Sequence, residues 1–66
     1  MSIAKTIEVS ADCTKGFDAA VEDGIAKASE TVEHIERAWI KDQIVLIKDG
    51  KVQSYRVHMN LTFALK

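Results

Sequence analysis

The sequence of 66 residues contains no proline, one cysteine and only four aromatic side chains. Because Cys13 has no second cysteine in this chain, an intrachain disulfide is excluded. No cysteine and histidine residues stand at the spacing of a structural zinc site either. A chain of this length buries only about 60% of its unfolded surface, so an isolated monomer is marginally stable. Self-association is therefore the expected way to complete the core.

The sequence also lacks an excess of charge of either sign. It has nine basic and ten acidic residues and a net charge of −1. Nucleic-acid-binding proteins present a clustered basic face, so no nucleic-acid partner is expected. No apolar run approaches the roughly 18 residues of a membrane span, so no membrane partner is expected. The first five residues lack the apolar core of a secretory signal, and with a lone thiol they predict a cytoplasmic location.

Sequence motifs of catalytic chemistry are missing as well. The chain has no glycine-rich phosphate loop, no nucleophile elbow and no obvious pair of catalytic carboxylates. We therefore expect a protein that is not an enzyme, and we assign no metal ligand. Carboxylates gathered around a symmetry axis of an oligomer would be the one plausible way to hold a divalent cation.

The residues that are present predict a single domain over residues 1–66, with the element order strand, helix, strand, strand. Apolar and polar residues alternate over 3–9, which predicts the first strand. Residues 10–14 predict a loop, in which Asp12 or Thr14 would cap the following helix. Residues 15–32 carry an apolar stripe at helical spacing and predict an amphipathic helix.

Two long strands are predicted over 35–47 and 52–65. The Asp49-Gly50 pair between them suits a type I′ hairpin turn. Gly24 lies inside the predicted helix, where glycine costs about 1 kcal/mol, so we expect another backbone to approach closely there. One helix can cover only one face of the resulting sheet.

The uncovered face of the sheet carries the candidate site. Trp39, the only tryptophan, shares strand parity with Arg37 and therefore points away from the helix. An exposed tryptophan is typical of subunit interfaces and of platforms for flat ligands, and both interpretations remain open. In the second, Trp39 stacks on a small aromatic ligand, Arg37 and Arg56 supply positive charge, and Gln43 adds polar contacts.

The chain resembles the dodecin family. The resemblance rests on the string FDAAVEDGIAKA at 17–28, the string ETVEHI at 30–35 and the string YRVHMNLTFAL at 55–65, and it covers essentially the whole chain. It implies an α+β fold of the β-α-β-β type, in which a three-stranded antiparallel sheet wraps around one helix. It also implies a homo-oligomer in which twelve copies form a hollow sphere.

The resemblance further implies a ligand. Many dodecins bind FMN or riboflavin between a stacking tryptophan of the second strand and a glutamine of the third. In this sequence Arg37 and Arg56 occupy those two places, and Trp39 follows two residues later on the same strand. The expected function is a flavin-type binding and storage subunit of a homododecamer. The alternative is a structural or cation-binding shell of the same assembly without bound flavin.

Overall fold

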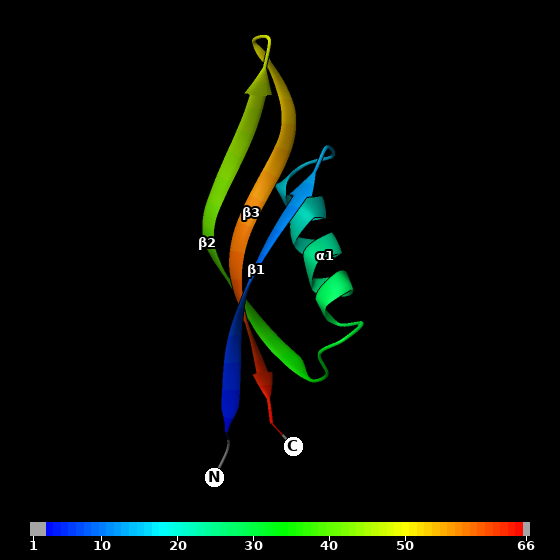
Figure 1. Ribbon diagram of the computed structural model, residues 1–66, viewed down its shortest axis with the longest axis vertical. Coiled ribbons are helices and arrows are strands. Elements are labelled where there is room, and N and C mark those ends of the chain that lie inside the picture. Colours follow the sequence, from blue (N-terminus) through cyan, green and yellow to red (C-terminus); the bar gives the residue numbers. More distant parts are fainter. Residues whose placement is uncertain (1–2, 66) are drawn as a thin grey trace.

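The computed structural model describes residues 3–65 and contains one helix and three strands (Figure 1). In chain order they are β1 (Ala4–Cys13), α1 (Phe17–Ala28), β2 (Ile35–Lys48) and β3 (Lys51–Ala64). The strands form one antiparallel sheet in the order β1-β3-β2, so the last strand is the central one. The predicted α+β class and β-α-β-β order are confirmed.

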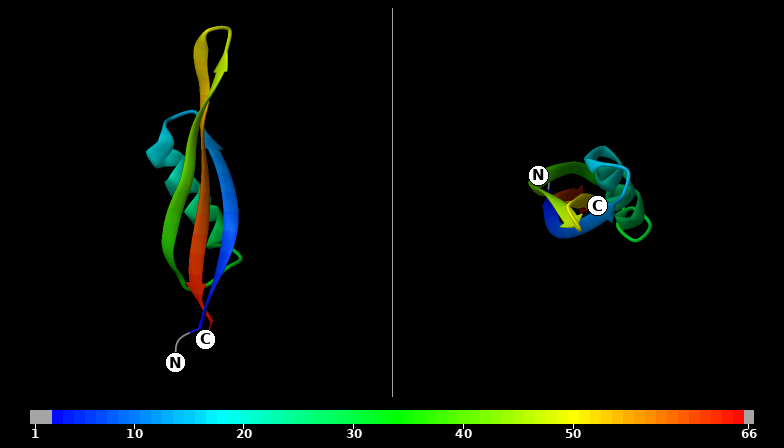
Figure 2. Two further views of the ribbon diagram at one scale, coloured as in Figure 1. Left: turned by 90° about the vertical axis from the view of Figure 1, so that its left-hand side faces the viewer. Right: turned by 90° about the horizontal axis from the view of Figure 1, so that it is seen from above.

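Helix α1 packs against one face of this sheet (Figure 2). Its Ala20 meets Val57, Met59 and Leu61 of the central strand, and these four residues are fully buried. The alternation along β3 explains the core, because successive side chains of a strand point to opposite faces. We call the sheet face that points away from α1 the open face; in β3 it is formed by Arg56, His58, Asn60 and Thr62.

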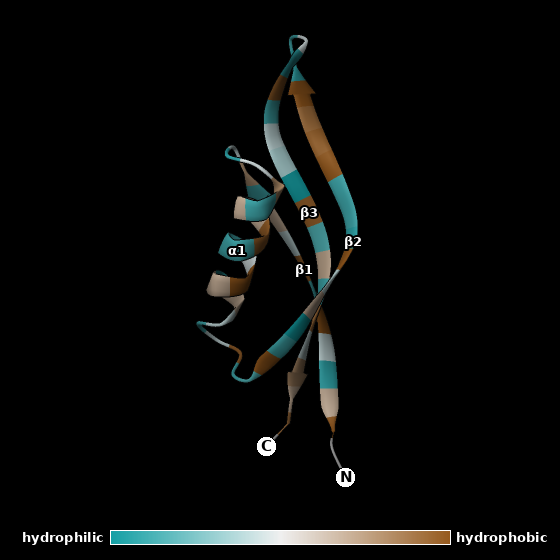
Figure 3. Cartoon of the chain, turned by 180° about the vertical axis from the view of Figure 1, so that it is seen from behind, coloured by the Kyte–Doolittle hydropathy of each residue, from teal (hydrophilic) through white to brown (hydrophobic). Residues whose placement is uncertain are grey.

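The molecule is elongated. Its radius of gyration is 13.5 Å, whereas a compact chain of this length has one of roughly 11 Å. The cause is the β2–β3 hairpin, which projects past the end of β1 (Figure 1). Its apolar residues are continuous near the tip of β2 (Figure 3). Four of them are exposed: Ile44, Val45, Ile47 and Val52.

The predicted boundaries of β1 and α1 are wrong in three places. Residues 10–13 extend β1 instead of forming a loop, because they pair with residues 55–58 of β3. The helix begins after Gly16, which has no side-chain cap, so neither Asp12 nor Thr14 caps it. It ends at Ala28 and not near Val32, although turn-like hydrogen bonds to the carbonyls of residues 27 and 28 continue up to Val32.

The predictions for the Asp49-Gly50 turn and for close packing at Gly24 agree better with the structure than the predicted boundaries do. Asp49 and Gly50 both have positive φ, 54° and 76°, as a type I′ turn requires. A Cβ atom on Gly24 would lie 2.6 Å from Cε of Met59 and 3.0 Å from Cβ of Ala11. The close approach at Gly24 is thus found, but the neighbours are side chains and not a backbone. Within residues 3–65, no helix has the length and apolarity to cross a membrane.

Candidate functional site

Trp39 and Arg37 lie side by side on the open face. In the β2–β3 pairing, Trp39 is opposite Asn60 and Arg37 is opposite Thr62. Thr6 of β1 faces the same Thr62 from the other side. Residues opposite each other in antiparallel strands project to the same face, so all five side chains share one surface. Trp39 is 71% exposed, which makes it the most exposed large apolar side chain of residues 3–65.

These side chains border a hollow of about 590 Å³, which lies within the usual size range of small-molecule sites. Two hydroxyl oxygens, Oγ1 of Thr6 and Oγ1 of Thr62, lie 3.3 Å apart within hydrogen-bonding distance. The lining combines an indole, a guanidinium, an amide and two hydroxyls, and it contains no carboxylate: Thr6, Arg37, Ala38, Trp39, Asn60 and Thr62. We call this feature the Trp39 hollow.

Arg56 lies on the same face but is held by a neighbour. Its Nε donates to Oδ1 of Asp12 at 2.7 Å, and its Nη2 donates to Oδ2 of the same carboxylate at 2.9 Å. The hydrogen bonds from Arg56 lower the pKa of Asp12, and those to Asp12 raise the pKa of Arg56. Arg56 does not line the Trp39 hollow. The structure therefore separates the two arginines that the sequence grouped together.

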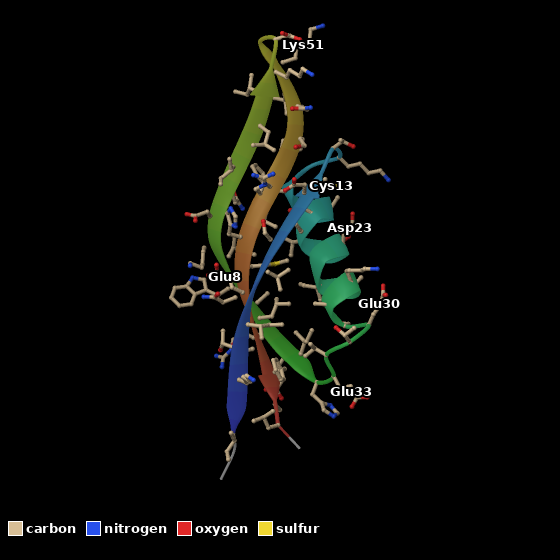
Figure 4. All side chains as sticks on the ribbon, in the orientation of Figure 1. Glu8, Cys13, Asp23, Glu30, Glu33 and Lys51 are labelled. Atoms are coloured by element: carbon tan, nitrogen blue, oxygen red, sulfur yellow. The ribbon has the colours of Figure 1, made fainter. Side chains whose placement is uncertain are left out.

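A second ion pair crosses the open face from β2 to β1. Nζ of Lys41 donates to Oε2 of Glu8 at 2.8 Å. This hydrogen bond lowers the pKa of the Glu8 carboxyl and raises the pKa of the Lys41 ammonium. Glu8 lies beside β1 on the side away from α1 (Figure 4) and is opposite Asn60 in the sheet. A carboxylate whose charge is balanced by Lys41 therefore stands next to the Trp39 hollow.

Gln43 is not on the open face, contrary to the predicted grouping. The pairing of β2 with β3 shifts by one residue between Ile40 and Asp42. An extra residue in a strand inverts the parity of everything that follows it. Gln43 is consequently opposite Val57, a fully buried residue that faces α1. Trp39 lies before the shift, so Trp39 and Gln43 point to opposite sides of the sheet.

The structure offers no metal centre within one copy of residues 3–65, where no three metal-ligating side chains gather. The thiol of Cys13 is half-buried against the core and accepts a 3.4 Å hydrogen bond from the backbone N–H of Lys15. Its surroundings explain it as a packing residue.

Several residues of the site were missed in the sequence. Thr6, Asn60 and Thr62 have the strand parity of the open face, and this signal was sufficient to find them. The partnership of Asp12 with Arg56 spans 44 positions, and no local pattern indicates it. It becomes visible only when β1 is known to pair with β3 and to extend to Cys13.

Comparison with known proteins extends over almost the whole chain. The family model for dodecin matches residues 3–66. The dodecin from Streptomyces davaonensis superposes with a TM-score of 0.94 at 22% sequence identity, covering 98% of this chain and 96% of that one. The dodecin from Streptomyces coelicolor does so with a TM-score of 0.93 at 26% identity, covering 98% and 93%.

A third solved structure is named for a different ligand. It is a calcium dodecin from Mycobacterium tuberculosis with a calcium-binding site, and it superposes with a TM-score of 0.84 at 21% identity. The match covers 98% of this chain and 93% of that one. Among curated proteins, none matches this sequence.

Proposed function

Because this chain belongs to the dodecin family, we propose that it is a non-enzymatic subunit of a hollow homododecamer that binds and stores a flavin-type ligand. The observation that carries the proposal is the exposure of Trp39 beside a hollow of about 590 Å³. A large aromatic side chain left 71% exposed on a sheet face gains stability when a flat ring or another subunit covers it. FMN and riboflavin are the first candidates, since the family is known for flavins.

The residues of the Trp39 hollow offer a stacking surface for a flat ligand, but the glutamine that binds the ring edge in the family is absent. Trp39 would stack against the ring, and the amide of Asn60 would offer a donor and an acceptor to its polar edge. The place of the family's glutamine is taken by Arg56, whose Nε and Nη2 already donate to Asp12. Recognition of the ring edge would therefore fall to Asn60 and not to the third-strand position used elsewhere in the family.

Self-association is supported by the shape of the single chain. Only four apolar residues of the described chain are fully buried, and the projecting hairpin leaves apolar side chains exposed. Exposed apolar patches of this kind mark contact surfaces between proteins. In a shell of twelve copies, the open face and the hairpin would be covered by neighbouring subunits, and a ligand at Trp39 would lie at such a contact.

The alternative is a structural or cation-binding shell without an organic ligand. The likeness to a calcium dodecin favours it. Within residues 3–65 of one copy, however, no cluster of metal-ligating side chains exists, so a cation site would need residues from several subunits. In this version Trp39 would serve only as an assembly contact.

Fluorescence titration tests the proposal directly. FMN and riboflavin are titrated with the assembled protein, and binding is read as quenching of flavin emission. We expect quenching at micromolar protein for at least one of them. Unquenched flavin beside an intact oligomer would refute the flavin proposal, and calorimetric binding of Ca²⁺ by the same sample would favour the cation-binding shell.

Two alanine variants separate ligand binding from assembly. Trp39→Ala removes the proposed stacking surface, and we expect an intact oligomer by light scattering with flavin affinity reduced at least tenfold. Ile44→Ala is the matched control, because Ile44 is also apolar, exposed and on the open face but does not line the Trp39 hollow. It should leave flavin affinity unchanged. Loss of the oligomer in Trp39→Ala would instead assign Trp39 to an assembly contact.

A further inference from the structure

We propose that the Trp39 hollow selects aromatic ligands that carry an anionic group, a phosphate monoester above all, and that Arg37 makes the selection. This inference rests on the proposed ligand-binding function and adds the charge class of the ligand. It starts from a difference between the two arginines that the sequence alone does not reveal.

The first step is the charge inside the hollow. Arg37 is the only ionisable side chain among the residues that line it. The remaining polar groups are two threonine hydroxyls, the amide of Asn60 and the indole N–H of Trp39, all of which can donate hydrogen bonds. A lining with one fixed positive charge, four neutral donors and no carboxylate favours an anion, and the carboxylate opposite Asn60, that of Glu8, is paired with Lys41.

The second step is the engagement of the neighbouring cations. Lys41 and Arg56 are the other permanently charged cations on this stretch of the open face, and they donate to Glu8 and Asp12 at 2.7 to 2.9 Å. Within residues 3–65, Arg37 takes part in no ion pair. Its guanidinium therefore keeps the planar set of donors that binds phosphate in a bidentate manner. A ligand anion does not have to displace an internal carboxylate to reach it.

The third step is the spacing between the ring surface and the charge. Arg37 and Trp39 are alternate residues of one strand and share a face, so their Cα atoms are about 7 Å apart. Thr6, Thr62 and Arg37 form one row across the three strands, and Asn60 and Trp39 belong to the next row. An aromatic ring on Trp39 would thus leave room for a short side chain that ends in a phosphate between Arg37 and the paired hydroxyls.

FMN and riboflavin are the natural pair of probes, because they share the ring and differ in one phosphate. At low ionic strength, we expect FMN to bind at least tenfold more tightly than riboflavin, in keeping with a charge-assisted hydrogen bond. The ratio should fall as salt is added, since an open site is screened. Arg37→Gln should bring the ratio of FMN to riboflavin affinity close to one. Arg37→Lys should leave an intermediate ratio, because lysine keeps the positive charge but cannot donate two parallel hydrogen bonds to the phosphate.

The double variant Glu8→Gln with Lys41→Gln is the matched control, since it removes a cation from the same face together with the carboxylate that is its partner. It should leave the ratio of FMN to riboflavin affinity unchanged. Equal binding of both flavins by the unmodified protein would overturn the inference while the proposed function stands. A ratio that survives in Arg37→Gln would also overturn it, and failure of both flavins to bind would overturn inference and proposed function together. If Arg37→Gln does not assemble, the salt dependence of the ratio in the unmodified protein decides.

Discussion

At the scale of single residues, Asp12 and Arg56 show how the pairing of two strands shifts the pKa values of surface side chains. Their two hydrogen bonds join opposite residues of β1 and β3. The pKa of Asp12 is lowered mainly by the hydrogen bonds from Arg56, and the pKa of Glu8 is lowered mainly by the one from Lys41. A carboxyl whose pKa is lower in the folded state stabilises the fold above its unfolded pKa and loses that contribution as pH falls.

A prediction for pH follows from this sign. Asp12→Asn should lower the thermal midpoint by a few degrees at most at pH 7, because exposed ion pairs contribute little. The difference from the unmodified protein should shrink as pH falls below the ordinary aspartate pKa, because the pKa of Asp12 is lowered in the folded state, and it should vanish once the carboxyl is protonated in the folded state as well. Thermal unfolding of both proteins at matched concentration and at several pH values measures this difference in thermal midpoint. A difference that persists undiminished at low pH would show that packing, and not the ion pair, is responsible.

At the scale of elements, Gly24 fixes how closely α1 approaches the sheet. Gly24→Ala would gain about 1 kcal/mol in helix propensity. The new Cβ would, however, meet Cβ of Ala11 at 3.0 Å and Cε of the fully buried Met59 at 2.6 Å. Overpacking of this kind costs about 1–3 kcal/mol, so we expect net destabilisation of up to about 2 kcal/mol. Urea unfolding measures it.

A second substitution tests the cause of that effect. Ala11→Gly removes the rigid neighbour, so in the double variant the cost of Gly24→Ala should shrink relative to its cost in the unmodified protein. Purely additive effects of the two substitutions would contradict a clash between residues 11 and 24. A net stabilisation by Gly24→Ala would mean that Met59 and α1 move apart more easily than their burial indicates.

The elements could be predicted from the sequence wherever the information is local. The alternation in residues 52–65 and the Asp49-Gly50 turn needed no knowledge of the rest of the chain. The helix end was overestimated because Val32 continues the apolar spacing even though the regular helix stops at Ala28. The shared face of Trp39 and Arg37 could be predicted from their parity, because both precede the shift near residue 41.

The remainder of the site could not be predicted, because it depends on pairing between distant strands. Gln43 was placed on the wrong face because the extra residue in β2 is recognisable only from its register with β3. The hydrogen bonds from Arg56 to Asp12 were not predicted, because the two residues are 44 positions apart in the sequence. Both errors arise because the register between paired strands cannot be obtained from the sequence of one strand alone.

At the scale of the whole molecule, we expect from the elongated shape that stability depends on self-association. An isolated chain with four fully buried apolar residues has a small core for the length of its hairpin. When folding and association are coupled, the apparent stability depends on protein concentration. We expect the thermal midpoint to fall by several degrees for each tenfold dilution, as the size scaling of small domains suggests.

Differential scanning fluorimetry across a hundredfold range of concentration, with light scattering on the same samples, measures this dependence. The expected result is a midpoint that tracks concentration and a loss of scattering that coincides with unfolding. A constant midpoint with a folded monomer at low concentration would contradict the coupling. It would mean that one helix and one sheet face suffice for a stable fold.

The position of the central strand also determines the order of events during folding. β1 and β2 do not pair with each other, and both pair only with β3, which follows them in the chain. The pairing of Ala4 with Ala64 closes almost the longest loop available to the described residues. During synthesis, β1 and β2 therefore have no strand with which to form backbone hydrogen bonds until β3 has been made. The three strands then form the sheet together. Such distant pairing slows folding, so β3 controls when β1 and β2 can join the sheet.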